Sequence, residues 1–178
     1  AVSLAMGLPP HNIERAISSI PPIPGRLEQI ACNCPGKVFI DYAHTPDAYE
    51  KLYSTLTKLK SKKDKIVTVF GCGGDRDVGK RSKMAEISET YSVFSYITLD
   101  NPRTESPDQI IADIIQGFST SNYEIINDRK TGLETALNNM DDDSILLVLG
   151  KGRESYQKIG MEKFHYSDVN TIEEFQNA

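Results

Sequence analysis

Val93-Phe94-Ser95-Tyr96-Ile97-Thr98-Leu99 is a short, largely apolar run that ends directly in Asp100-Asn101-Pro102-Arg103. Such a run predicts a strand buried on both faces, and the proline-containing tetrapeptide predicts the loop that follows it. In an open α/β sheet, ligands bind beyond the carboxyl ends of the strands. The side chains of Asp100, Asn101 and Arg103 are therefore candidate binding groups.

The chemistry of this tetrapeptide suits a zwitterion. Arg103 presents a planar guanidinium whose parallel N–H groups match the two oxygens of a carboxylate. Asp100 and Asn101 can bind an ammonium group or, alternatively, orient the loop itself. The loop thus points to a small ligand that carries both charges.

Apolar runs and helical patterns alternate along the rest of the chain. This alternation predicts a mostly parallel sheet flanked by helices on both faces, which is an α/β, Rossmann-like three-layer domain. The runs that predict strands are 38–40, 66–70, 93–99, 123–126, 145–149 and a shorter piece at 164–166. The segments that predict helices are 46–59, 81–91, 107–118 and 129–139.

The first residues are predicted to lie outside this domain. Residues 4–20 indicate two short helices, the second of them starting at Asn12 as its N-cap. Pro21-Pro22-Ile23-Pro24-Gly25 excludes helix and strand, so we expect the domain boundary there. Because the chain starts at Ala1 without a methionine, we expect a fragment of a longer protein.

Composition narrows the class of ligand. The chain has 178 residues, 39% of them hydrophobic, which is enough for one domain with a core. Its formal net charge of -5 argues against a nucleic-acid partner. No apolar stretch reaches the roughly 20 residues that cross a bilayer, so no membrane partner is expected. The three cysteines, Cys32, Cys34 and Cys72, lack the spacing of metal ligands and are expected to be cytosolic thiols.

Polar clusters follow four of the predicted strands. Aspartate and glycine also occur after strands as helix caps and turn residues, so each loop alone has a purely structural alternative. Their occurrence at one edge of the sheet favours a shared site. The clusters are Asp41-Tyr42-Ala43-His44-Thr45-Pro46-Asp47, Gly71-Cys72-Gly73-Gly74-Asp75-Arg76-Asp77, Asp100-Asn101-Pro102-Arg103 and Gly150-Lys151-Gly152-Arg153-Glu154.

The glycine-rich cluster matches neither phosphate-binding fingerprint. Residues 74–81 approach G-x-x-x-x-G-K-[ST], but Arg81 replaces the hydroxyl residue that binds Mg²⁺. Asp75 and Asp77 would also place negative charge against the phosphates. Arg76 stands at the third glycine position of G-x-G-x-x-G. We expect Arg76 to bind an anionic group of a substrate or, alternatively, to pair with one of the two aspartates.

Taken together, these clusters resemble a known family. The resemblance is carried by Pro24-Gly25-Arg26-Leu27-Glu28, by the four clusters above with Gly79-Lys80-Arg81 and Thr104-Glu105, and by Tyr156-Gln157. They are similar to the C-terminal domain of Mur ligases, and within that family to the members that add meso-diaminopimelate to UDP-MurNAc-L-Ala-D-Glu in peptidoglycan synthesis. The resemblance covers nearly the whole chain. It implies that residues 25–178 form this domain and that residues 1–24 are the remnant of a central ATPase domain and linker.

The resemblance implies an ATP-dependent amide-bond formation in the cytoplasm. ATP phosphorylates the side-chain carboxyl of D-glutamate, and the amino group of diaminopimelate attacks the acyl phosphate, releasing phosphate. The C-terminal domain brings the amino acid and binds part of the ATP. The phosphate loop, the Mg²⁺ ligands and a modified lysine belong to the central domain, and the uridine nucleotide binds to the N-terminal domain. No metal ligand is therefore expected in this chain, which by itself is expected to be inactive.

The family pattern also implies two groups of site residues. For ATP they are Arg26 at the phosphates, with Asp41, Tyr42 and His44 near the ribose and base. For meso-diaminopimelate they are Arg76, Asn101, Arg103, Gly150 and Glu154, to which the chemistry of the loop adds Asp100. Diaminopimelate differs from lysine by one carboxylate, so Arg103 is the expected partner of that carboxylate and Glu154 of the distal ammonium.

Two positions depart from the family pattern. Arg153 stands where histidine is usual and adds a permanent cation next to the pocket. Leu99 stands where a polar residue is frequent and indicates a slightly longer strand. The alternative function is a free-standing, non-catalytic binding or regulatory domain that reuses the ligase fold. A folate polyglutamate-adding ligase shares the fold but is not expected to show the Asp-Asn-Pro-Arg loop.

Overall fold

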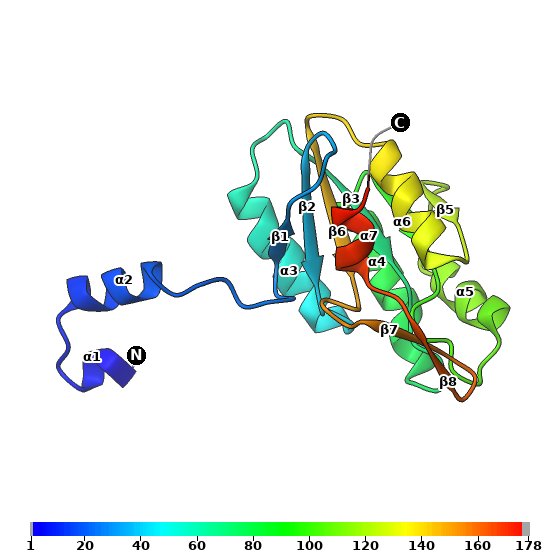
Figure 1. The fold of residues 1–178 in the computed structure, drawn as a ribbon, viewed down its shortest axis with the longest axis horizontal. Helices are drawn as coiled ribbons and strands as arrows, with labels where there is room; N and C mark the ends of the chain where they lie inside the picture. Colours follow the sequence, from blue (N-terminus) through cyan, green and yellow to red (C-terminus); the bar gives the residue numbers. More distant parts are fainter. Residues whose placement is uncertain (1, 176–178) are drawn as a thin grey trace.

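A computed structural model describes residues 2–175, which form a six-stranded sheet with helices on both faces (Figure 1). In their order across the sheet, the strands are β1 (Glu28–Ile30), β2 (Lys37–Asp41), β6 (Ser144–Leu149), β3 (Lys65–Phe70), β4 (Phe94–Ile97) and β5 (Tyr123–Ile125). Strand β1 is antiparallel to β2, and the other neighbours pair in parallel. The predicted α/β fold is confirmed.

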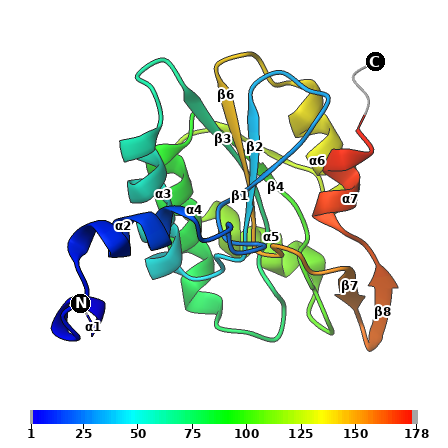
Figure 2. The same cartoon turned by 60° about the vertical axis from the view of Figure 1, so that its left-hand side comes forward.

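The sheet divides the core into two layers, and helices cover each of them. The covering helices are α3 (Pro46–Leu59), α4 (Arg81–Tyr91), α5 (Pro107–Ile115), α6 (Arg129–Asn138) and α7 (Asp168–Glu173). The first three pack on one face and the last two on the other, as Figure 2 shows for α3 and α7. Strand β6 is buried along its length, with Ile145, Leu147 and Leu149 in the first layer and Leu146 and Val148 in the second. A strand covered on both faces is expected to be apolar throughout.

Local chemistry explains where the helices begin and end. The Thr45 side chain accepts a hydrogen bond from the Ala48 N–H, and Pro46 occupies the first turn, where its missing N–H costs nothing. Helices α3 and α4 span the predicted residues. Helix α5 is shorter than the predicted 107–118, because the N–H of Gly117 donates to Ile114 and closes a tighter turn.

The structure corrects three details of the predicted strands. Strand β4 ends at Ile97, so the longer strand inferred from Leu99 is wrong; the Leu99 N–H donates to the Asn127 carbonyl in the loop beyond β5. Strand β1 was not predicted. The piece at 164–166 belongs to a separate antiparallel hairpin of β7 (Tyr156–Ile159) and β8 (Glu162–His165).

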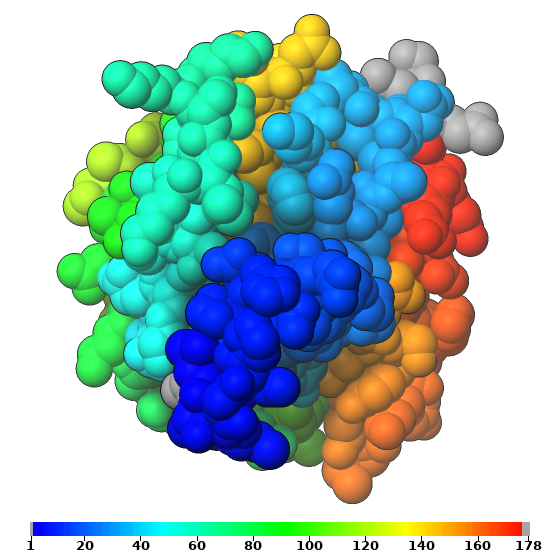
Figure 3. Space-filling model, turned by 90° about the vertical axis from the view of Figure 1, so that its left-hand side faces the viewer, coloured from blue at the N-terminus to red at the C-terminus, as the bar shows by residue number. Residues whose placement is uncertain are grey.

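The N-terminal segment lies apart from the sheet. Helices α1 (Val2–Ala5) and α2 (Pro10–Ser18) contain no buried residue, and Figure 1 shows them projecting from one side of the domain. Figure 3 views the molecule from that side, with the N-terminal segment in front. Helix α2 begins with Pro9 as its N-cap rather than at Asn12. No helix found in residues 2–175 is long and apolar enough to cross a membrane.

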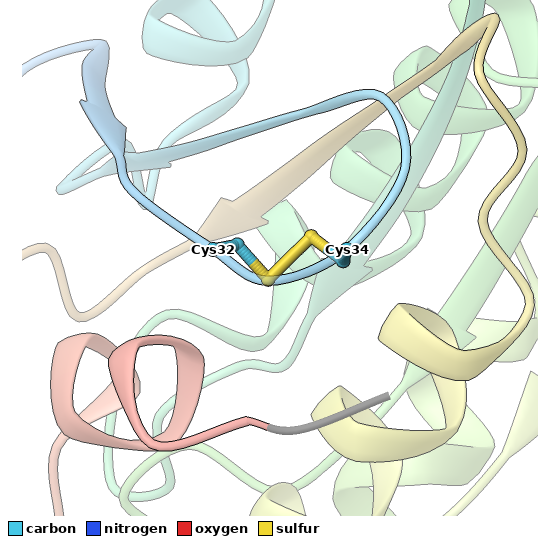
Figure 4. The surroundings of a disulfide bond; sticks show 2 residues. All are labelled: Cys32 and Cys34. Atoms are coloured by element: carbon cyan, nitrogen blue, oxygen red, sulfur yellow. A yellow bond between two sulfur atoms is a disulfide. The ribbon is translucent and has the colours of Figure 1, made fainter. Parts of the chain in front are cut away.

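The cysteines differ from the expectation of three thiols. Cys32 and Cys34 form a disulfide in the turn between β1 and β2, with their Cα atoms 5.3 Å apart (Figure 4). That separation lies within the range a disulfide can bridge. The thiol prediction is therefore wrong for these two residues, and Cys72 is free and buried.

A buried ion pair joins the carboxyl ends of the strands to α7. Arg129 Nε and Nη2 donate to the two carboxylate oxygens of Asp168 at 2.9 and 2.8 Å, and both side chains are fully buried. Arg129 Nη2 also donates to the Leu149 carbonyl at 3.0 Å, and Nη1 to Thr98 Oγ1 at 3.3 Å. One guanidinium thus connects β6, the end of β4 and two helices.

Replacing Arg129 by alanine leaves the Asp168 carboxylate buried without its cation. We expect Arg129→Ala to lower the free energy of unfolding by about 3–5 kcal/mol. Lys130→Ala is the matched control, because Lys130 is exposed and its ion pair with Glu134 is long, at 3.8 Å. This substitution should lower the free energy of unfolding by less than about 1 kcal/mol. Urea unfolding followed by circular dichroism measures both values. Equal losses in the two variants would contradict the importance of the buried pair.

Candidate ligand-binding site

The loops after β2, β3, β4 and β6 meet at one edge of the sheet, because these strands run in parallel. Together they enclose an open cavity of about 390 Å³. Its walls carry charged and polar side chains from all four loops. The residues that line the cavity are Tyr42, His44, Thr45, Gly73, Arg76, Asp77, Lys80, Asp100, Asn101, Arg103, Gly150 and Glu154.

Most of the site residues predicted from the sequence line this cavity. They are Tyr42, His44, Arg76, Asp100, Asn101, Arg103, Gly150 and Glu154. Arg26 lies beside it, with its guanidinium carbon 5.4 Å from the centre of the Tyr42 ring. Asp41 is buried and accepts hydrogen bonds from the N–H groups of Ala43 and Leu27, both at 2.7 Å. Asp41 therefore shapes the loop that carries Tyr42 and His44.

Arg103 is held in an unusual backbone conformation at the cavity wall. Its φ of 53° is in the left-handed region, which costs energy for a residue with a side chain. The β7–β8 hairpin holds it there: the Arg103 N–H donates to Lys158 at 3.1 Å, and its carbonyl accepts from Gly160 at 2.7 Å. Nη1 donates to the Gly74 carbonyl at 2.7 Å. Throughout residues 2–175 no carboxylate forms an ion pair with Arg103, so its charge remains for a ligand.

Glu154 faces Arg103's loop from the β6 side. Its Oε2 accepts a hydrogen bond from Asn101 Nδ2 at 3.2 Å, and its Oε1 lies 3.5 Å from the Tyr42 hydroxyl. Burial, and then the charges of Glu154 and Asp100, raise the pKa of Tyr42. The phenol therefore stays protonated and donates to the carboxylate.

Arg76 is not paired with either neighbouring aspartate in the described part of the chain. Asp75 Oδ2 accepts from the Thr104 backbone and hydroxyl at 3.1 and 2.9 Å, and Asp77 accepts from Gly79 N–H at 2.9 Å, where it caps the short helix η1 (Val78–Lys80). Among the described residues, the acceptor of Arg76 is the Asp75 carbonyl, at 3.3 Å. The aspartates thus shape the loop and leave the guanidinium at the cavity.

Arg81 is part of the scaffold rather than of the cavity wall. It is fully buried, with Nη1 2.6 Å from Glu105 and 2.7 Å from Asp113, and its Nη2 donates to the Gly73 carbonyl at 3.2 Å. These hydrogen bonds lower the pKa of Glu105, whose Oε2 accepts from the Asp75 N–H at 2.8 Å. Arg81 and Glu105 therefore connect the loop after β3 to the loop after β4.

Close packing explains the glycines after β3. A Cβ on Gly71 would overlap the Thr98 carbonyl oxygen, and one on Gly74 would overlap that of Pro102. The glycines let the two loops touch, which agrees with the rejection of a phosphate loop. Burial raises the pKa of Cys72 in the same loop to about 12, so its thiol is not an activated nucleophile.

Two lysines near the cavity had no role predicted from the sequence. Lys80 lines the cavity, and its Nζ donates to the His44 carbonyl at 2.8 Å. Lys151 is fully buried behind Asp100 and Glu154. A lysine between two glycines looks like an exposed turn residue, so no pattern in the sequence indicated this burial.

Among residues 2–175 there is no group of three histidine, cysteine, aspartate or glutamate side chains that could hold a metal ion.

The cavity belongs to a fold shared with known proteins. A family model described as "Mur ligase, glutamate ligase domain" matches residues 25–152. The chain is 49% identical over 148 residues to a UDP-N-acetylmuramoyl-L-alanyl-D-glutamate–2,6-diaminopimelate ligase of Chlamydia trachomatis, covering 83% of this chain and 30% of that protein. With a ligase of the same name from Clostridium acetobutylicum the identity is 42%, covering 96% of this chain and 35% of that protein.

Solved structures agree with these relatives. A structure titled as a UDP-N-acetylmuramoyl-L-alanyl-D-glutamate–2,6-diaminopimelate ligase superposes with a TM-score of 0.77 at 33% identity, over 96% of this chain and 35% of that one. A folylpolyglutamate synthase of Mycobacterium tuberculosis, with a TM-score of 0.64 at 21% identity over 84% of this chain and 34% of that one, shares the fold. The chain spans about a third of the length of the curated relatives it matches. By the match of residues 25–152 and the fold that surrounds its cavity, this chain belongs to the Mur ligase family.

Proposed function

We propose that this chain is the C-terminal domain of an ATP-dependent ligase that adds meso-diaminopimelate to UDP-MurNAc-L-Ala-D-Glu in the cytoplasm. The observation that carries the proposal is the cavity, where Arg103 offers a cation without a carboxylate partner in residues 2–175 and Glu154 offers a carboxylate in the same wall. A ligand with both an ammonium and a carboxylate satisfies the two together. The names of the relatives supply the identity of the amino acid.

In this proposal the cavity binds the incoming amino acid. Arg103 and Arg76 bind its carboxylates, and Glu154 with Asp100 binds the distal ammonium. Asn101 and the backbone at Gly150 complete the wall. Lysine lacks the second carboxylate, so it would leave a guanidinium unpaired inside the cavity, and that cost favours diaminopimelate.

The wall around Tyr42, which adjoins Glu154, is the proposed ATP side. Arg26 lies against the Tyr42 ring, and His44 Nδ1 is 2.8 Å from the Tyr42 carbonyl, so these side chains occupy one short stretch of wall. Asp41 holds that stretch in place. A related synthase has been crystallised with AMPPNP and Mn ion. We place the Mg²⁺ ligands in the central domain of the longer protein.

Residues 1–24 are proposed to be the end of that central domain and a linker, with residues 25–178 as the C-terminal domain. The exposure of apolar side chains in the N-terminal segment supports this division: Leu4 is 56%, Ile17 62% and Ile20 63% exposed. Apolar side chains exposed together on a short helical segment favour packing against another domain.

The contribution of this domain to the reaction is positional. It holds the amino acid so that one amino group can reach the acyl phosphate formed on D-glutamate, and the ammonium must lose a proton before it attacks. Fixing the amine beside the acyl phosphate removes much of the entropy cost of a bimolecular step. The phosphoryl chemistry itself belongs to the neighbouring domain.

The reaction is tested with the full-length protein that contains this chain. We expect ADP release from ATP only when UDP-MurNAc-L-Ala-D-Glu and meso-diaminopimelate are both present, with formation of the tripeptide product detected by mass spectrometry. Lysine in place of diaminopimelate should give much slower release. No diaminopimelate-dependent product under these conditions would instead favour a non-catalytic binding or regulatory domain.

Arg103→Ala separates amino-acid recognition from ATP binding. Loss of a bidentate, charge-assisted contact should lower kcat/KM for diaminopimelate by about 10- to 100-fold. The KM for ATP should change by less than about 2-fold, because Arg103 is on the amino-acid side of the cavity. Arg103→Lys keeps the charge without the planar fork and should give an intermediate loss. Equal losses for the amino acid and for ATP would remove Arg103 from this role.

A further inference from the structure

Lys151 is a fully buried lysine directly behind the cavity wall. Its Nζ donates to Asn101 Oδ1 at 3.2 Å and to the Tyr156 carbonyl at 2.9 Å. The same atom lies 3.0 Å from Asp100 Oδ1 and 3.6 Å from Glu154 Oε2. Lysines are almost never fully buried unless they are paired, and here the partners are three residues of the cavity wall.

Lys151 and the backbone N–H of Lys158 together fix how Asn101 is oriented. An ammonium group can only donate hydrogen bonds, so the amide oxygen of Asn101 must face Lys151. The same oxygen accepts from the Lys158 N–H at 2.7 Å. The amide NH₂ of Asn101 is therefore directed to the other side, where it donates to Glu154 Oε2 at 3.2 Å.

Lys151 also determines which oxygen of Glu154 faces a ligand. Oε2 is occupied by Asn101 and lies near the Lys151 ammonium. Within residues 2–175, the polar contact of Oε1 is the 3.5 Å one with the Tyr42 hydroxyl, so it is the oxygen that can accept from a ligand ammonium.

The buried charge of Lys151 balances the acidic groups of the wall. Asp100 Oδ1 is buried and accepts no hydrogen bond from the described residues, so its ion pair with Lys151 is what offsets its charge there. Without this cation, Asp100 and Glu154 would make the cavity more negative. A more negative cavity disfavours diaminopimelate, whose charges sum to zero, relative to lysine, which carries a net positive charge.

We infer that Lys151 is a positioning residue for amino-acid selection, which acts through Asn101 and Glu154 without touching the ligand. This inference rests on the proposed function. It assigns the preference for diaminopimelate over lysine to two cations of different kinds: Arg103, which contacts the ligand, and Lys151, which sets the orientation and charge of the groups around it.

The test uses Lys151→Met in the full-length protein, because methionine is similar in length and carries no charge. We expect kcat/KM for diaminopimelate to fall by about 30-fold, mainly through KM, while the KM for ATP changes by less than about 2-fold. The ratio of kcat/KM for diaminopimelate to that for lysine should fall by about 10-fold. Lys130→Met, at an exposed lysine of α6, is the control and should match the wild type.

A double-mutant cycle tests whether Lys151 acts through Glu154. Glu154→Gln is made with and without Lys151→Met, and the two effects on the KM for diaminopimelate should be less than additive. If Lys151→Met alone does not fold, it is combined with Asp100→Asn. This double variant removes the closest pair of opposite charges together and therefore leaves fewer unpaired charges. The net charge of the cavity is unchanged in this double variant, so a loss of selectivity against lysine beyond that of Asp100→Asn alone reports the orientation of Asn101 and Glu154.

Each outcome of these measurements decides the inference. Wild-type KM and selectivity in either Lys151 variant, additive effects in the cycle, or equal losses for diaminopimelate, lysine and ATP would overturn it. Failure of both Lys151 variants to fold would also overturn it, because Lys151 would then support the fold rather than selection. A wild-type protein without diaminopimelate-dependent ADP release would instead overturn the proposed function.

Discussion

The parallel pairing of β6 with both β2 and β3 determines where the polar loops of this domain lie. In the ladder between β2 and β6, Asp41 is opposite Leu149, so the chain leaves both strands at the same height. Phe70 is opposite Ile97 in the ladder between β3 and β4, which brings the loops after them together in the same way. Because residues 145–149 of β6 are all apolar and buried, a shift by one residue would keep their burial but misalign these loops.

This constraint explains which parts of the structure could be predicted from the sequence. Strands β2, β3 and β6 are apolar runs, and the rule that ligands bind beyond their carboxyl ends located the cavity. Strand β1 is only Glu28–Ile30 and does not differ from a loop by composition, and β8 is exposed along its length, so the sequence indicated only a short piece at 164–166. The burial of Lys151 depends on carboxylates that lie far from it in the sequence or are themselves partly exposed, and no local pattern encodes that.

Buried cations stabilise the edge of the sheet and, by doing so, leave other cations for a ligand. Arg81 pairs with Glu105 and Asp113, and Arg129 pairs with Asp168. These carboxylates are therefore already neutralised inside the scaffold. Arg103 and Arg76 retain their charge at the cavity as a result, and within residues 2–175 neither forms an ion pair. The same side-chain type thus serves two purposes, and burial distinguishes them.

The linker that ends at Gly25 enters the domain beside this cavity and contacts two of the loops that form it. The Tyr42 N–H donates to the Gly25 carbonyl at 3.0 Å, and Gly25 packs against Gly152. Arg153 Nε donates to Glu28 at 2.8 Å, and Glu28 also accepts from the Gly25 N–H at 2.6 Å. The guanidinium of Arg153 therefore ties the end of the linker to the loop that carries Glu154. A change in the direction of the linker would act on the wall of the cavity through these contacts.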